Sequence, residues 1–167
     1  MFFYYIKIIG GVTVEKDNKV VILKTQDRKY AIDVYNVERI LEYTKPKALP
    51  ETSEHIIGIM SYEESILPVI DLNKRLYKEG YLDTGENKIV VIIWEDHRLG
   101  LMVDDVLEIK DIEEDKIHKK AEVNTEIKKE YLKGFIKEDE DIIIYLNPNK
   151  IFSSSQKEEL KDVIKDS

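Results

Sequence analysis

The chain has 167 residues, the size of one ordinary domain or two very small ones, and a 43% hydrophobic content that is enough for a core. Its formal net charge of -8 argues against binding to nucleic acid or to an anionic membrane surface. With no cysteine and only three scattered histidines, the sequence predicts no disulfide, no thiol nucleophile and no metal site.

The chain begins with an apolar stretch, residues 1–9, that is too short to span a bilayer and lacks the features of a signal peptide. We therefore expect a soluble, cytoplasmic protein. Further along, short runs rich in β-branched residues are bounded by charged or turn residues, which is typical of buried strands. These runs are residues 20–23, 66–70, 89–94 and 142–146.

Helical spacing occurs only in short pieces. Val37, Ile40 and Leu41 fit one turn of helix, and a second short helix is expected over residues 72–77, with Gly80 as its C-cap. A terminal helix over residues 153–167 is predicted from two features. Ser155 and Glu158 form a possible capping box, and an apolar stripe follows: Leu160, Val163 and Ile164.

An internal repeat is the most informative feature. Residues 29–40 align with 98–109, and residues 58–76 align without a gap with 134–152. Two similar halves predict two small β-barrels that pack on each other, because each alone is too small for a large core. We expect the first barrel over residues 20–82, the second over 83–152, and an N-terminal extension over residues 1–19.

Candidate chemistry is sparse. Glycine-rich phosphate loops and nucleophile elbows are absent. Asp104 and Asp105 could form a catalytic pair, but a turn after the strand Leu101–Val103 is the better interpretation. His55 is expected at a strand edge or on the surface. The sequence thus argues against an enzyme and for an interaction module; an acid–base enzyme and an acidic nucleic-acid-binding barrel are the competing hypotheses.

Residues 19–152 nevertheless carry a specific series of motifs. Tyr30-Ala31-Ile32-Asp33-Val34 precedes Ile66-Leu67-Pro68-Val69-Ile70-Asp71-Leu72, and Leu99 to Val106 follows in the second half. This order resembles CheW-type chemotaxis coupling proteins. The resemblance implies two packed five-stranded SH3-like barrels, no catalytic residue and no cofactor. It also implies a cytoplasmic adaptor at the edge of receptor arrays on the inner membrane.

The implied partners are the regulatory domain of a CheA-type histidine kinase and the cytoplasmic tip of chemoreceptors. The receptor groove between the barrels would be formed by nine residues: Val37, Arg39, Ile40, Met60, Ser61, Tyr62, Glu63, Leu101 and Val103. The kinase-facing surface would be formed by five: Tyr43, Lys45, Lys47, Ile57 and Gly58. The alternative is that most of the apolar groove residues are simply core; for Ile40 and Val103 the two interpretations are equally favoured.

Two charges depart from the family pattern. The family usually has N-L-R-G where this chain has Ser61-Tyr62-Glu63-Glu64, so Glu63 stands at the arginine position. Arg39 stands where the family favours glutamate. Because both signs are reversed, we expect Arg39 and Glu63 to form an ion pair of opposite polarity. The reversal also leaves open an alternative function, an adaptor for a non-chemotactic kinase pathway with altered receptor preference.

Overall fold

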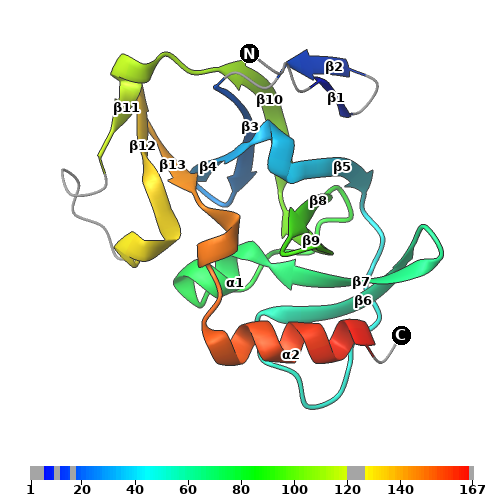
Figure 1. The fold of residues 1–167 in the computed structure, drawn as a ribbon. Coiled ribbons are helices and arrows are strands. Elements are labelled where there is room, and N and C mark those ends of the chain that lie inside the picture. Colours follow the sequence, from blue (N-terminus) through cyan, green and yellow to red (C-terminus); the bar gives the residue numbers. More distant parts are fainter. Residues whose placement is uncertain (1–5, 10–11, 16–17, 120–126, 166–167) are drawn as a thin grey trace.

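A computed structural model describes residues 6–9, 12–15, 18–119 and 127–165 (Figure 1). Short strands and 3₁₀ turns make up most of it. The strands are β1 (Ile6–Ile9), β2 (Val12–Glu15), β3 (Lys19–Thr25), β4 (Arg28–Asp33), β5 (Val37–Glu42), β6 (Ile56–Tyr62), β7 (Ser65–Asp71), β8 (Lys88–Trp94), β9 (His97–Val103), β10 (Asp105–Asp111), β11 (Ile117–His118), β12 (Leu132–Glu138) and β13 (Asp141–Leu146). The helices are α1 (Leu72–Tyr77) and α2 (Ser154–Lys165), with 3₁₀ turns η1 (Val34–Asn36), η2 (Glu114–Lys116), η4 (Lys129–Tyr131) and η5 (Pro148–Lys150).

Two sheets form the body of the molecule. The six-stranded sheet has the order β10-β3-β4-β13-β12-β11, and the five-stranded sheet has the order β5-β8-β9-β7-β6. Neighbouring strands are antiparallel except for β4–β13 and β7–β9, which are parallel. The hairpin β1–β2 is separate and lies against β5. The predicted all-β fold of two packed SH3-like units with a C-terminal helix is confirmed, with β11 as a sixth strand in one sheet.

The repeat appears in the structure as an exchange of strands. The first repeat supplies β3 and β4 to the six-stranded sheet, whereas its later strands β5, β6 and β7 lie in the five-stranded sheet. The second repeat does the reverse, because β8 and β9 join the five-stranded sheet. The expected boundary between residues 82 and 83 therefore does not separate the sheets, since each one takes strands from both sides of it.

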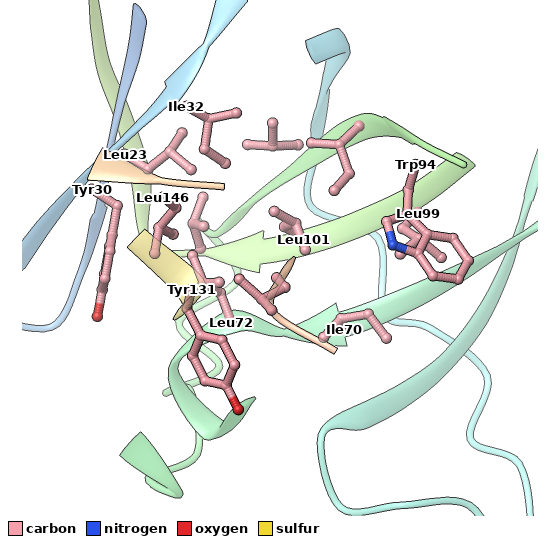
Figure 2. Close-up of a cluster of buried hydrophobic side chains, with 14 of the residues drawn as sticks. Leu23, Tyr30, Ile32, Ile70, Leu72, Trp94, Leu99, Leu101, Tyr131 and Leu146 are labelled. Carbon is pink, nitrogen blue, oxygen red and sulfur yellow. The ribbon is translucent and has the colours of Figure 1, made fainter. Parts of the chain in front are cut away.

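Three apolar clusters explain why the strand runs are continuously hydrophobic. Along β8, Val90 and Ile92 face the cluster between the sheets, while Ile89 and Val91 face a second cluster inside the five-stranded sheet. The six-stranded sheet has its own inner cluster, which includes Val20. Strands buried on both faces lose the polar alternation of a surface strand. Figure 2 shows the cluster between the sheets.

The predicted helical turn over Val37, Ile40 and Leu41 is wrong, because these residues lie in strand β5. The pairing of β5 with β8 shifts register between Val37 and Arg39, which leaves Glu38 as an extra residue. A β-bulge of this kind moves the next inward side chain by one position, so the apolar spacing imitates that of a helix. Strand β10 has the equivalent shift between Val106 and Glu108.

Both true helices have caps that differ from the predicted ones. Helix α1 ends at Tyr77 and its C-cap is Lys78, whose φ is 64° and whose N–H donates to the Lys74 carbonyl, so Gly80 is not the C-cap. The capping box of α2 lies two residues earlier than expected: Ser153 N–H donates to Gln156 Oε1 at 2.8 Å, and Gln156 N–H donates to Ser153 Oγ at 3.3 Å.

The apolar stripe of α2 is confirmed, with Leu160 fully buried in the cluster between the sheets. Figure 1 shows α2 running beneath the five-stranded sheet, next to β6 and β7. In the described ranges, no helix is both long and apolar enough to cross a membrane.

Candidate functional site

An exposed ion pair joins β5 to the hairpin between β6 and β7. Arg39 Nη2 lies 2.9 Å from Glu63 Oε1, and each side chain is 52% exposed. Glu63 and Glu64 occupy the two-residue turn with φ values of 43° and 62°, so both adopt the left-handed conformation that tight hairpins require. The turn holds the Glu63 carboxylate against β5, and the predicted contact between the two reversed charges is confirmed.

A second set of polar contacts lies directly beside this pair. Tyr62 Oη donates to Glu38 Oε2 at 2.7 Å, and the Arg98 Nε–H donates to both oxygens of the same carboxylate at 2.7 and 2.8 Å. The Arg39 guanidinium also lies 5.6 Å from the centre of the Tyr62 ring. These five residues from β5, β6, β9 and the hairpin form one group, which we call the charged cluster: Glu38, Arg39, Tyr62, Glu63 and Arg98.

Two members of the charged cluster, Tyr62 and Arg98, have raised pKa values. Burial, followed by the hydrogen bond to Glu38, raises the pKa of Tyr62 well above its usual value, so the phenol stays a neutral donor. The hydrogen bond to Glu38 likewise raises the pKa of Arg98. Arg39 and Glu63, each 52% exposed, form the more exposed of the two ion pairs in the cluster, since Glu38 in the other pair is 23% exposed.

The predicted receptor-groove residues fall into two groups. Val37, Leu101 and Val103 are fully buried in the cluster between the sheets, so they are core residues and do not line a surface groove. Leu101 is seen at the centre of that core in Figure 2. In a strand that is buried on both faces, the sequence has no polar alternation to show which side chains face outward. The sequence therefore could not show that these three residues are core.

The other predicted groove residues lie at or near the surface. Ile40 and Met60 are half-buried, Ser61 is exposed, and the Tyr62 ring is only 6% exposed. Met60 packs against the inner cluster of the five-stranded sheet, whereas Ile40 packs against the cluster between the sheets. The structure thus brings together Arg39, Tyr62 and Glu63, but not the complete predicted set.

Sequence reasoning missed two members of the charged cluster, Glu38 and Arg98. Glu38 is the extra residue of the β5 bulge, and it meets Arg98 across the strand that lies between β5 and β9. No local spacing could reveal a contact between residues that are 60 positions apart in the chain. The only available signal was the charge of Glu38 among apolar, β-branched residues, and this signal does not identify Arg98 as its partner.

Four of the five predicted kinase-facing residues lie on β6 or on the connection after β5 that runs beside it: Lys45, Lys47, Ile57 and Gly58. The connection after β5 runs antiparallel to β6, with Lys47 N–H donating to the Ile59 carbonyl at 2.8 Å and Ile59 N–H donating to the Lys47 carbonyl at 2.9 Å. Gly58 is required there, because a Cβ at this position would stand 2.2 Å from the Lys47 carbonyl oxygen. Ile57 is half-buried beside it, and Lys45 is exposed.

A surface hollow of about 490 Å³ opens between this connection and β6. Its lining combines apolar and basic side chains: Thr44, Lys45, Lys47, Ile59, Met60, Ser61 and Ile66. Tyr43 stands apart from the hollow and donates to Asp83 Oδ2 at 2.5 Å, a bond that raises the pKa of the phenol. An apolar floor with a charged rim is the usual composition of a protein-binding surface.

Asp104 and Asp105 have structural roles, as the turn interpretation predicts. The Asp104 carboxylate accepts from the Gln26 N–H at 2.6 Å, and the Asp105 carboxylate accepts from the Val106 N–H at 2.9 Å. Across the side chains that the structure describes, residues 18–119 and 127–165, no group of three acidic or histidine residues is placed to hold a metal ion.

Comparison with known proteins identifies the family to which this fold belongs. The family model described as the CheW-like domain matches residues 19–156. The chain belongs to the CheW-like domain family. The match includes both sheets and the charged cluster, and it begins after the hairpin β1–β2.

Several CheW-like relatives are similar over most of their length. The chemotaxis protein CheW of Treponema pallidum is 25% identical over 149 residues, which are 87% of this chain and 88% of the relative. That of Bacillus subtilis is 29% identical over 109 residues, 65% of this chain and 70% of the relative. The crystal structure of the scaffolding protein TtCheW from Thermoanaerobacter tengcongensis matches with a TM-score of 0.75 and 28% identity, covering 83% of this chain and 90% of that one.

Proposed function

We propose that this chain is a non-enzymatic adaptor that couples chemoreceptors to a CheA-type histidine kinase in chemotaxis signalling. Membership of the CheW-like family supports the general role. The observation that carries the proposal for this particular chain is the exposed Arg39–Glu63 pair, which stands on two elements that the resemblance assigns to receptor contact. The charged cluster would meet the receptor tip, and the hollow beside β6 would belong to the kinase-facing surface.

The physics of the pair favours a role in recognition over one in stability. An exposed ion pair contributes only about 0.2–1 kcal/mol, because water and salt screen it and both side chains lose conformational entropy. The same charges affect a partner more strongly, because they set the encounter rate and penalise a like-charged partner surface. A receptor tip that matches this chain would therefore carry charges opposite to those preferred by relatives with the usual polarity.

The hollow beside β6 suits a different partner surface. Ile59, Met60 and Ile66 provide its apolar floor, while Lys45 and Lys47 give one rim a positive charge on a protein that is acidic overall. A kinase regulatory domain that docks here would present apolar side chains flanked by acidic ones.

The test is a binding measurement with the kinase regulatory domain and the receptor cytoplasmic fragment encoded in the same genome as this chain. Reversing two charges with Lys45→Glu and Lys47→Glu is expected to weaken kinase binding by about tenfold and to leave receptor binding unchanged. The variant with Lys137→Glu and Lys150→Glu, at exposed positions on β12 and η5, is the control that makes the same change of charge elsewhere.

Each outcome bears on the proposal. Binding of both partners, with only the kinase affected by the paired lysine change, supports the adaptor function and the assignment of the two surfaces. Equal weakening by the control would overturn the assignment of the hollow. Failure of the unmodified chain to bind either partner would overturn the adaptor function itself.

A further inference from the structure

Two surface hollows adjoin each other where α1 meets the N-terminal end of α2. The first, of about 450 Å³, is lined by Ser53, Glu54, His55, Lys74, Arg75, Lys78 and Gln156. The second, of about 440 Å³, is lined by Arg75, Leu76, Lys78, Lys128, Tyr131, Ser153 and Gln156. Arg75, Lys78 and Gln156 border both hollows. Figure 1 shows α1 directly above the first turn of α2.

This junction lies away from the charged cluster. Glu63 precedes the first residue of β7 and α1 follows its last residue, so the two sites stand at opposite ends of a seven-residue strand. At about 3.3 Å per residue, the strand separates them by roughly 20 Å. A ligand in the hollows therefore would not contact the Arg39–Glu63 pair.

Positive charge gathers at the junction although the chain as a whole is acidic. Lys74 lines the first hollow, Lys128 lines the second, and Arg75 and Lys78 line both. Lys74 already has an oxyanion beside it, because Glu54 Oε2 lies 3.4 Å from its Nζ, and the Glu54 side chain is 85% exposed. In the part of the chain that the structure describes, none of the other three cations forms a salt bridge.

The hydrogen-bonding groups around the hollows are incompletely used. His55, which lines the first hollow, is only 6% exposed, and its Nε2 has no hydrogen-bond partner. Arg75 donates through Nη2 to Tyr131 Oη at 2.8 Å, but its Nε–H is buried without an acceptor. Both atoms are themselves buried, so an oxyanion in the hollows would reach them only if the side chains turned outward, which would recover the roughly 1–3 kcal/mol that a buried polar group without a partner costs.

Aromatic contacts hold Arg75 in place between the hollows. Its guanidinium lies 4.9 Å from the centre of the Tyr131 ring and 5.9 Å from that of Phe152. Figure 2 shows the Tyr131 hydroxyl pointing out of the core, away from Leu72. A guanidinium fixed in this way is prepared to bind an oxyanion with little further loss of entropy.

We infer that the paired hollows bind an anion with at least two phosphate groups, one in each hollow, with Arg75 and Lys78 between them. The division of Lys74 and Lys128 between the hollows is the reason for a diphosphate rather than a single phosphate. The N-terminal end of α2 adds its favourable dipole to the site. The two sources with this chemistry are inorganic pyrophosphate and a nucleoside diphosphate.

The experiment titrates the ¹⁵N-labelled chain with sodium pyrophosphate, sodium phosphate and ADP at constant ionic strength, and follows amide chemical shifts. Pyrophosphate is expected to give saturable shifts at His55, Arg75, Lys128 and Gln156, and to bind about tenfold more tightly than phosphate. The variant with Lys78→Gln and Lys128→Gln is expected to lose about tenfold in pyrophosphate affinity. The matched control is Lys45→Gln with Lys47→Gln, which removes the same charge elsewhere.

The outcomes separate the possibilities. ADP affinity equal to that of pyrophosphate would assign the site to a nucleotide, and weaker ADP binding would assign it to the inorganic ion. Equal affinity for phosphate and pyrophosphate would overturn the two-hollow arrangement. Shifts that do not saturate, or an equal loss in the control variant, would overturn the site. None of these results depends on the kinase or the receptor.

Discussion

Reversing the Arg39–Glu63 pair one charge at a time, and then both together, tests its predicted role. At 2.9 Å in bulk water, two unit charges attract by about 1.4 kcal/mol, and salt and side-chain entropy reduce this further. Because both side chains are 52% exposed, we expect the pair to contribute about 0.2–1 kcal/mol to stability. Arg39→Glu places two carboxylates together beside Glu38, whereas Glu63→Arg places two guanidinium groups together.

The assay is a double-mutant cycle carried out twice, once on urea unfolding and once on receptor-fragment affinity. Each single reversal is expected to weaken receptor binding, and the double reversal should recover much of the loss. Kinase-domain affinity should stay constant in all three variants, because neither Arg39 nor Glu63 lines the hollow that we assign to the kinase. Repeating the unfolding cycle in about 1 M NaCl should remove most of the coupling, since the Debye length falls to about 3 Å.

Two results would refute the reasoning. Additive losses in receptor affinity, with no recovery in the double reversal, would mean that the two charges do not act together in recognition. A coupling free energy well above about 1 kcal/mol in the unfolding cycle would mean that the pair is mainly structural. Salt-independent coupling would point to packing of the aliphatic parts of the side chains rather than to charge.

Three further substitutions, one of them with a matched control, test the surrounding structure by denaturation. Gly58→Ala should destabilise the chain by about 2–4 kcal/mol, because its Cβ would stand 2.2 Å from the Lys47 carbonyl oxygen. Gly80→Ala is the control: its Cβ would have no neighbour closer than 3.8 Å, so stability should change by less than about 0.5 kcal/mol. Tyr62→Phe should cost about 1.5–3 kcal/mol by removing a hydroxyl that donates to a carboxylate on β5; an unchanged midpoint would contradict that bond. Burial, followed by the charge of Arg75, lowers the pKa of His55. The contribution of His55 to the free energy of unfolding is therefore full above about pH 6.5 and is lost as the pH falls through the lowered pKa. His55→Phe should reduce the pH dependence of the free energy of unfolding in that range.

Much of the fold can be predicted from the sequence, because continuous apolar runs indicate buried strands. Strands buried on both faces lose their polar alternation, which marks β3 and β8 clearly. The same property hides which side chains face outward, so the sequence does not distinguish a core residue such as Leu101 from a groove residue. The β5 bulge at Glu38 also imitated a helix, because one inserted residue changes a period of two into helix-like spacing.

Of the contacts between residues far apart in the sequence, some could be predicted and others could not. The reversed charges of Arg39 and Glu63 predicted a contact because opposite signs at two departures from one pattern constrain each other. Arg98 carried no such signal, and its contact with Glu38 depends on the order of strands in the five-stranded sheet. The strand exchange was equally hidden, because a repeat in sequence has the same pattern whether its units fold separately or trade strands.

The exchange of strands between the repeats has a consequence for how the chain folds during synthesis. Strand β4 ends at Asp33, but its parallel neighbour β13 begins only at Asp141, about 110 residues later. At about 5–20 residues per second, a ribosome needs roughly 5–20 s to deliver that neighbour, whereas the β3–β4 hairpin can form in about 1–10 μs. During this interval the nascent hairpin carries an unpaired edge and two apolar faces, which are the features that promote aggregation. The first half of this chain therefore stays open to aggregation until the second half has been synthesised, and its folding yield should depend on translation speed.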